Sequence, residues 1–358
     1  MTKIDRHIRN SVLFSVLVLA SLISVVDLVF AVAEEIGNTT ETYTTLNAFS
    51  LVMLTTPTRV YELLPFAVLG GALIGLGVLA SNNEIIVIQS AGVRTRRIVW
   101  AVLKPVIVIM VLNLVVGEYI APPLEQLGQS NKALQRIGNN ASNSLLGTWQ
   151  KIGNEFVHIN AIAPGGEQLF GVTRYRVDDR RRVIASSYAD SADYLREGER
   201  GFWRLNNVKE TLFETSHVAT NNYLEEEWQV ELSPNLLSVL IIVPDRQSIS
   251  GLYRFARYFE SEGLDPDEYL LAFWKKLLQP VATLALVVLA ISFVFGSLRE
   301  TTMGVRVFVA IGIGLGYTIL QRLLEPVSLL YGFSPLLAVL TPIALALALG
   351  LLMLRRVR

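Results

Sequence analysis

The chain has 358 residues, of which 52% are hydrophobic and only 17% charged, and its 31 basic side chains balance its 31 acidic ones. Soluble domains carry about a quarter charged residues. The composition therefore excludes a disordered chain, a coiled coil and a nucleic-acid binder that depends on a basic surface. The absence of cysteine excludes a disulfide framework, a thiolate nucleophile and a cysteine-based metal site.

The charges are distributed unevenly along the chain. Residues 122–268 contain 15 basic and 21 acidic side chains, whereas the two flanks together contain 16 basic and 10 acidic ones. An acidic, polar middle segment is therefore enclosed by two apolar, basic flanks. This division predicts a water-exposed domain inserted between two membrane-embedded halves.

Six apolar runs in the flanks are long enough to predict transmembrane helices, since a helix needs about 20 apolar residues to cross the hydrocarbon. They lie at residues 12–33, 63–80, 98–120, 277–295, 305–323 and 336–354, and the second is expected to begin earlier, near Thr58. The first run follows Lys3, Arg6 and Arg9, but it is longer than the apolar stretch of a cleaved signal peptide and contains Asp27. We therefore expect it to be retained.

The short connections alternate between basic and non-basic. Arginine and lysine cluster before the first span, between the second and third, between the fourth and fifth, and after the sixth, at Lys3, Arg6, Arg9, Arg94, Arg96, Arg97, Arg299, Arg306, Arg355, Arg356 and Arg358. Residues 34–61 contain only Arg59, and residues 325–335 contain no basic side chain. By the positive-inside rule, both termini are expected in the cytoplasm and the middle segment outside it.

The middle segment shows the alternation of period two that is typical of strands. Six strands are predicted, separated by turn signals, at residues 153–162, 170–177, 183–189, 203–212, 223–232 and 237–243. Their regular spacing predicts a sandwich or jelly roll rather than βαβ units. A short amphipathic helix at about 253–262 is expected to lead the chain back to the membrane.

The sequence also lacks several kinds of catalytic chemistry. It contains no phosphate-binding loop of the G-x-x-x-x-G-K-[ST] type and no G-x-S-x-G nucleophile motif, and its three histidines have no metal-ligand spacing. These features argue against an enzyme. ATP hydrolysis in particular is not expected on this chain.

The connection between the second and third spans is the strongest candidate for a contact with another protein. Residues 84–92 have the length of a short helix, are apolar on much of their surface and end at Gly92, with three arginines following. Such a helix lies on the membrane surface or inserts into a cleft of a cytoplasmic partner. In the second case, Glu84 near its start is the acid that a partner arginine could hold.

Other features have a functional and a structural explanation. The pairs Gly71/Gly75 and Gly312/Gly316 have the spacing that lets helices approach closely, within the chain or between chains. Asp27 and Glu118 face a cavity, a partner, or simply the membrane interface. Lys104, Lys275 and Lys276 can extend to headgroups, and Lys132 contacts an anionic headgroup or is an ordinary exposed lysine.

The arrangement of three spans, a β domain and three more spans resembles the LptF/LptG family of lipopolysaccharide-export ABC permeases. The stretches that carry the resemblance cover nearly the whole chain: IDRHI at 4–8, LPFA at 64–67, GGALIGLG at 70–77, SAGV at 90–93, GEYIAP at 117–122, SISGL at 248–252, ISFVFGSLR at 291–299 and MGVRV at 303–307. The SISGL element and the glycine-rich second span resemble the LptG branch of the family more closely than the LptF branch.

The resemblance implies a polytopic α-helical membrane protein, three spans plus three, with an inserted periplasmic β-jelly-roll domain. The expected domains are an N-terminal membrane half at 1–121 with a coupling helix at about 82–93, the β domain and return helix at 122–268, and a C-terminal membrane half at 269–358. The expected location is the bacterial inner membrane. The implied partners are an LptF-like permease, a cytoplasmic LptB-like ATPase dimer that binds ATP and Mg²⁺, and a periplasmic LptC/LptA-like bridge, with lipopolysaccharide as substrate and no nucleic acid.

The resemblance also implies roles for particular residues. The coupling helix would contact the ATPase through Glu84, Ile85, Ile88, Gln89 and Gly92. The lateral gate between the first span of one subunit and the fifth of the other would involve Leu28, Ile311 and Leu315, unless these residues only face lipid or pack inside the bundle. Asp27, Ala31 and Lys132 would lie near the cavity. Some family members have a lysine where this chain has Ala31, and Gln129 occupies a second position that is basic in them.

A protein of another class would explain part of the pattern. A membrane-anchored periplasmic binding or assembly protein without an ATPase accounts for the β domain. It does not account for an apolar helix held between two cytoplasmic span ends.

Overall fold

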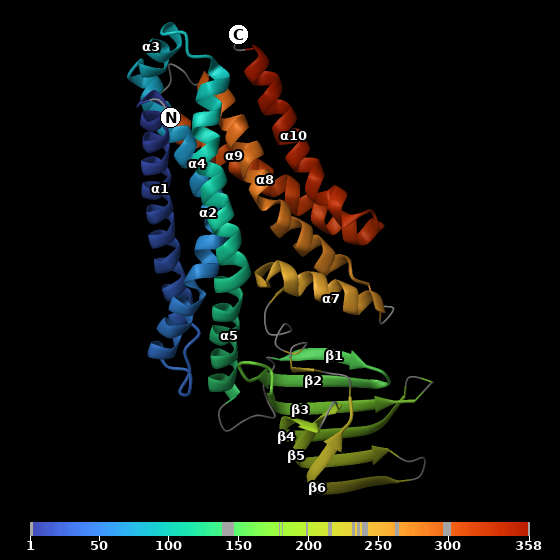
Figure 1. The fold of residues 1–358 in the computed structure, drawn as a ribbon. Coiled ribbons are helices and arrows are strands. Elements are labelled where there is room, and N and C mark those ends of the chain that lie inside the picture. Colours follow the sequence, from blue (N-terminus) through green and yellow to red (C-terminus); the bar gives the residue numbers. More distant parts are fainter. Residues whose placement is uncertain are drawn as a thin grey trace. The chain divides into compact units, whose positions relative to one another are not determined.

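A computed structural model gives the fold of the chain (Figure 1). The structure describes residues 3–137, 147–178, 180, 182–197, 200–213, 217–230, 233, 234, 237, 243–261, 265–295 and 302–356. Most of the strand predicted at 237–243 lies outside the described residues, as do Arg299 and Arg358.

Among the described residues, six helical segments are long and apolar enough to cross a membrane, which confirms the six predicted spans. The helices are α1 (Lys3–Ile36), α2 (Thr45–Ser81), α4 (Thr95–Val115) with η1 (Val116–Ile120) and α5 (Ala121–Ile137), α8 (Asp267–Phe295), α9 (Met303–Tyr331) and α10 (Pro335–Arg356). Each helix extends beyond its apolar run, and α2 begins well before Thr58. Hydropathy locates the part of a helix in the hydrocarbon, but the helical hydrogen bonds continue into the polar flanks.

The described residues also include three shorter helical elements. They are α3 (Glu84–Ser90), the 3₁₀ turn η3 (Pro244–Arg246) and α7 (Ile249–Ser261). The last confirms the predicted amphipathic helix, because Leu252, Phe255 and Ala256 are buried on one face. Its Phe255 and Phe259 rings lie 5.4 and 4.9 Å from the ring of Tyr269 at the start of α8.

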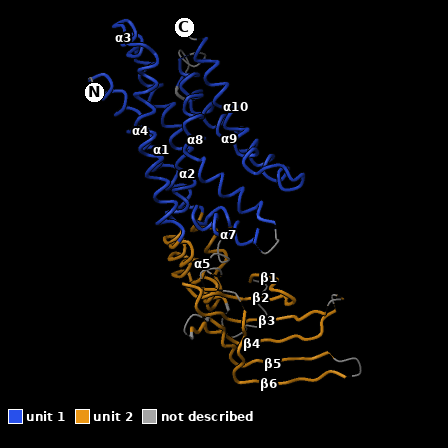
Figure 2. Tube along the Cα trace, turned by 45° about the vertical axis from the view of Figure 1, so that its right-hand side comes forward, with its two compact units in different colours: residues 1–30, 56–122, 244–358 blue, residues 31–55, 123–243 orange. Residues whose placement is uncertain are grey.

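The chain divides into two compact units (Figure 2). The membrane unit comprises residues 1–30, 56–122 and 244–358, and the β unit comprises residues 31–55 and 123–243. Within the membrane unit, α3 and both chain ends lie at one end of the bundle, and α7 lies toward the other (Figure 1).

The two glycine pairs differ in what surrounds them. A Cβ atom at Gly71 would lie 2.5 Å from the Cα of Val16, and one at Gly75 would lie 2.9 Å from the Cα of Val12. These glycines therefore allow α1 and α2 to pack backbone against backbone. At Gly312 and Gly316 a Cβ atom would meet nothing within 4 Å among the described residues.

Arg306 links α9 to α2 inside the bundle. Its side chain is 1% exposed, and its guanidinium donates a hydrogen bond to the carbonyl oxygen of Gly77. A Cβ atom at Gly77 would lie 2.7 Å from the Cδ of Arg306. The missing side chain at Gly77 therefore leaves the space that the arginine stem occupies, and the hydrogen bond offsets part of the cost of burying the charge.

The third span contains a π-helical turn, η1, where Glu118 is located. The sequence allowed a cavity, a partner or the interface for this carboxylate, and the structure gives it a partner within the chain. Glu118 accepts hydrogen bonds from the backbone N–H groups of Ile249, at 2.7 Å, and Ser250, at 3.3 Å. These are the first residues of α7, so Glu118 caps the positive end of that helix from another segment.

Replacing Glu118 by alanine is expected to loosen α7, because two N–H groups lose their acceptor. Loss of a capping acceptor costs about 0.5–2 kcal/mol. Thermal unfolding of the purified protein in detergent should shift to lower temperature, and the 249–261 backbone should exchange hydrogen faster. Glu118→Gln keeps one acceptor oxygen and should fall between wild type and alanine. Unchanged exchange in the alanine variant would contradict the capping role.

The β unit contains one antiparallel sheet in which every strand pairs with its neighbours in the chain, in the order β1 to β6. The strands are β1 (Thr148–Ile152), β2 (Glu155–Ile162), β3 (Gln168–Val177), β4 (Val183–Glu197), β5 (Arg200–Phe213) and β6 (Val218–Trp228). Trp203, Leu205 and Val208 of β5 are buried in its core with Val157 and Ile159 of β2.

The inserted β domain is thus confirmed, and its described strands form one sheet in which neighbours in the chain are neighbours in the sheet. Alternation of period two shows that one face of a strand is buried and does not show whether a second sheet covers it. The sequence also missed β1, and it placed the last strand of the sheet five residues too late.

Candidate coupling helix and lipid-contacting surfaces

The helix α3 is held between two turns with left-handed backbone. Asn83, with φ of 60°, precedes it, and Gly92, with φ of 83°, follows it. Ile85 and Ile88 are buried in the core of the membrane unit, whereas Val87 is 67% exposed. The helix is therefore anchored by one apolar face and offers the other to its surroundings.

Glu84 lies at the start of α3 in contact with the N-terminal segment. Its Oε2 is 2.6 Å from Nε2 of His7, and its Oε1 accepts a hydrogen bond from the Asn82 side chain at 3.4 Å. Arg97 holds the same N-terminal segment through Asp5, at 3.1 Å. A cavity of about 390 Å³ borders the helix and is lined by Lys3, Ile4, His7, Asn82, Glu84, Val87 and Ile88.

The predicted coupling residues therefore differ in how accessible they are to a partner protein. Glu84 is partly exposed beside the cavity, and the Gln89 side chain donates a hydrogen bond to Thr95 at 3.3 Å. Ile85 and Ile88 point into the core, and Gly92 forms the turn toward α4. Val87, which the sequence reading did not select, is the apolar side chain that α3 exposes most.

The spans α1 and α9 are the two least covered by the rest of the described chain. Only 11% of the apolar window of each is buried, compared with 67% for α2 and 61% for α8. On α9, Ile311 and Leu315 are 61% and 56% exposed, and Phe308 is 76% exposed. On α1, Phe14 and Leu17 are 70% and 63% exposed. These two helices present long apolar faces to lipid or to another protein.

The predicted residues toward the C-terminal end of α1 are less exposed. Leu28 is half-buried beside Asp27, which forms an ion pair with Arg59 of α2 at 3.5 Å. Both border a cavity of about 110 Å³. Ala31 is only 3% exposed, so its methyl group packs within the chain. The charge of Asp27 thus has a partner in its own chain.

Lys132 is also paired internally. Its Nζ lies 2.7 Å from Glu35, and the hydroxyl of Tyr43 donates to the same carboxylate at 2.9 Å. Burial and this hydrogen bond raise the pKa of Tyr43 above its ordinary value. The sequence predicts an exposed lysine or one bound to an anionic headgroup, and it does not indicate Glu35 as the partner because Glu35 is nearly a hundred residues away.

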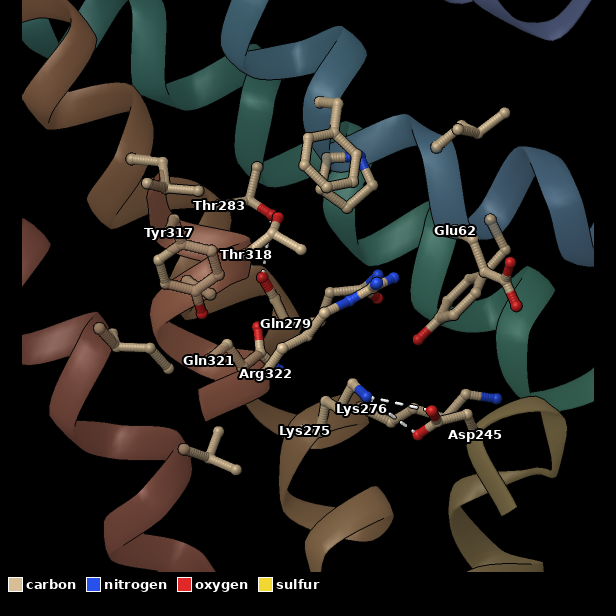
Figure 3. Close-up of a pocket in the computed structure, with 18 of the residues that line it drawn as sticks. Glu62, Asp245, Lys275, Lys276, Gln279, Thr283, Tyr317, Thr318, Gln321 and Arg322 are labelled. Carbon is tan, nitrogen blue, oxygen red and sulfur yellow. Dashed lines mark hydrogen bonds and ion pairs between the residues drawn. The ribbon is translucent and has the colours of Figure 1, made fainter. Parts of the chain in front are cut away.

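A pocket of about 410 Å³ lies between α2, α8, α9 and α10 (Figure 3). Lys275 binds Asp245 at 3.1 Å and Glu325 at 3.2 Å. Lys276 donates a hydrogen bond to the carbonyl of Gln247 and lies 5.0 Å from the ring of Tyr61. Arg322 of α9 extends toward the middle of the pocket (Figure 3).

These features define a class of protein. Six membrane-spanning helices, a β sheet inserted between the third and fourth, and a short helix held between the second and third form a multi-pass membrane protein. The chain matches the family model "Lipopolysaccharide export system permease LptF/LptG" over residues 6–356. It belongs to this family of transport permeases of the inner membrane.

Two relatives support the assignment. The chain is 34% identical to the lipopolysaccharide export system permease protein LptG of Escherichia coli K12 over 303 residues, which cover 84% of the chain and 83% of the relative. It is 31% identical to the protein of the same name from Haemophilus influenzae over 342 residues, which cover 95% and 94%. Both names agree with the LptG branch that the sequence resembles.

Proposed function

We propose that the chain is one of two permease subunits of an ABC transporter that extracts lipopolysaccharide from the inner membrane. Its partner in the membrane would be an LptF-like permease. ATP and Mg²⁺ would bind to a separate cytoplasmic LptB-like ATPase dimer, because this chain has no phosphate-binding loop. A periplasmic LptC/LptA-like bridge would receive the lipid from the β unit.

The observation that carries the proposal is the helix α3. It is anchored by Ile85 and Ile88, flanked by two spans, and has a partly exposed carboxylate at its start. A rigid helix of this kind transmits movement, because a force on its exposed face also shifts the ends of α2 and α4. The arginines 94, 96 and 97 that follow it favour a cytoplasmic location for this end of the bundle.

The exposed faces of α1 and α9 support the transport role. Each buried CH₂ contributes about 0.8 kcal/mol, so a lipid with several acyl chains leaves the bilayer only if another apolar surface replaces it. The exposed faces that include Phe14 and Leu17 on α1 and Ile311 and Leu315 on α9 would form the walls of a shared chamber with a second permease. Closure of that chamber would then expel the lipid toward the β unit.

Purification from bacterial membranes under mild detergent tests the proposal. A tagged form of this chain should retain a second permease and a cytoplasmic ATPase in fixed proportion, and all the chains can be identified by mass spectrometry. Retention of periplasmic proteins with no ATPase would instead favour the membrane-anchored binding protein and contradict the permease role. A tagged, unrelated six-span protein serves as the control for nonspecific capture.

A further inference from the structure

We propose that the cavity between α2, α8, α9 and α10 binds the phosphate group of a lipid headgroup, with Arg322 as its main ligand. This inference rests on the proposed function, since it assigns a site for the phosphorylated end of a membrane lipid. The cavity, of about 410 Å³, is within the range of small-molecule pockets, about 300–1,000 Å³.

The position of the cavity along the helices fits a headgroup. Glu62 lies 19 residues before the α3 end of α2, and Arg322 lies 19 residues after the start of α9. At about 1.5 Å per residue, both distances are about 28 Å, close to the thickness of the hydrocarbon, which is about 30 Å. The cavity is therefore at the depth where the leaflet opposite α3 has its phosphates.

The charged side chains around the cavity differ in whether they have a partner within the chain. Lys275 is neutralised by Asp245 and Glu325. Glu62 is held by Arg246 at 3.2 Å, and Lys276 by a backbone carbonyl and an aromatic ring. Within the part of the chain that the structure describes, Arg322 forms no ion pair.

Arg322 is exposed, so its guanidinium is accessible to a headgroup, and a guanidinium binds phosphate through two parallel hydrogen bonds. In Figure 3, the Arg322 side chain extends from α9 toward the middle of the cavity rather than away from the bundle. Its charge is thus directed at the space that a headgroup would fill.

Other polar groups of the cavity wall complement a phosphorylated headgroup. The hydroxyl of Tyr61 and the Oε1 of Gln279 are buried and have no hydrogen-bond partner within the described chain. Buried polar groups are normally paired. A phosphate could accept the Tyr61 hydrogen, and a headgroup hydroxyl could donate to Gln279, while Phe66, Leu286 and Ile343 provide an apolar wall for the adjoining hydrocarbon.

Two lipids offer this chemistry, a phosphorylated sugar lipid such as lipopolysaccharide and an ordinary glycerophospholipid. The experiment measures their binding to the detergent-purified complex by native mass spectrometry. Its probes are lipopolysaccharide, the same lipid with its phosphates removed, phosphatidic acid and diacylglycerol. Its variants are Arg322→Gln, Arg322→Lys and the control Lys104→Gln, which removes an exposed cation of α4 that does not line this cavity.

Arg322→Gln is expected to weaken binding of at least one phosphorylated probe by about tenfold or more and to leave binding of its phosphate-free counterpart unchanged. Arg322→Lys should be intermediate, since it keeps the charge and loses the paired geometry, and Lys104→Gln should match wild type. Selective loss of lipopolysaccharide identifies the transported lipid as the ligand. Equal loss of phosphatidic acid identifies a general phospholipid site.

Binding of both phosphorylated probes that is the same in wild type and Arg322→Gln would overturn the inference. Because Arg322 has no ion pair to lose among the described residues, the variant should unfold at the wild-type temperature. A wild-type complex that binds phosphatidic acid but no lipopolysaccharide would contradict the proposed function and leave the phosphate site intact. A complex that binds neither would contradict both.

Discussion

Glu84→Ala is expected to separate ATP hydrolysis from lipid transport. The alanine variant loses the carboxylate at the exposed start of α3, and a hydrogen bond to a charged partner contributes about 1.5–3 kcal/mol. That loss corresponds to roughly 10–150-fold weaker association with the ATPase. The fold should be preserved, because the helix is anchored by Ile85 and Ile88 rather than by Glu84. The measurements are ATPase retention on purification and lipid release in proteoliposomes.

Matched variants separate the possible causes. Ser90→Ala is the control, because Ser90 is exposed on the same helix and its hydroxyl donates to the carbonyl of Ile86 within that helix. His7→Ala removes the contact between α3 and the N-terminal segment while keeping the carboxylate. If Glu84→Ala assembled and transported lipid at the wild-type rate, Glu84 would have no coupling role. If His7→Ala reproduced the defect, the contact within the chain would be the cause.

Gly71→Ala is expected to disrupt the packing of α1 on α2. The added Cβ would lie 2.5 Å from Cα and 2.7 Å from the backbone nitrogen of Val16, and backbone atoms cannot move aside as a side chain can. Overpacking costs typically about 1–3 kcal/mol, and the backbone contact places this substitution at the upper end of that range. Thermal unfolding in detergent should shift downward, and yields from membranes should fall.

The second glycine pair gives the matched control. Gly312→Ala has the same change in helix propensity, in a span of similar length, but its Cβ would meet nothing within 4 Å among the described residues. It should leave the unfolding temperature of the chain at or slightly above that of wild type, because alanine favours the helix. Equal destabilisation by both substitutions would show that close packing against Val16 is not the reason for glycine at position 71.

Hydropathy and periodicity were sufficient to predict the spans, the inserted β domain and the amphipathic helix, because each depends on a local pattern. The same patterns could not give the start of α2, whose first turn contains the polar Thr45 and Asn47. They could not distinguish a single sheet from two, and they missed β1, which has only five residues. The sequence therefore predicts those structural features that hydropathy or periodicity alone determines.

The ion-pair and hydrogen-bond partners of the charged residues come from segments that are distant in the sequence. The sequence located Asp27, Glu118 and Lys132 but could not supply Arg59, the N-terminus of α7 or Glu35 as their partners. The cavity around Arg322 combines side chains from residues 61 to 343, and Arg322 was not selected because a single arginine near the end of a span resembles an interfacial anchor. Only the fold shows that it points into a cavity.

The bond between Arg306 and Gly77 has a consequence for biosynthesis. Its two residues are separated by 229 positions in the chain, and at a synthesis rate of about 5–20 residues per second, the ribosome needs on the order of 10–50 s to cover that interval. During this time α2 has already been synthesised, and the space beside Gly77 does not yet contain the Arg306 side chain. The nascent protein therefore spends this time in a state in which α2 is present and α9 is absent. This state ends when the fifth span is inserted into the membrane.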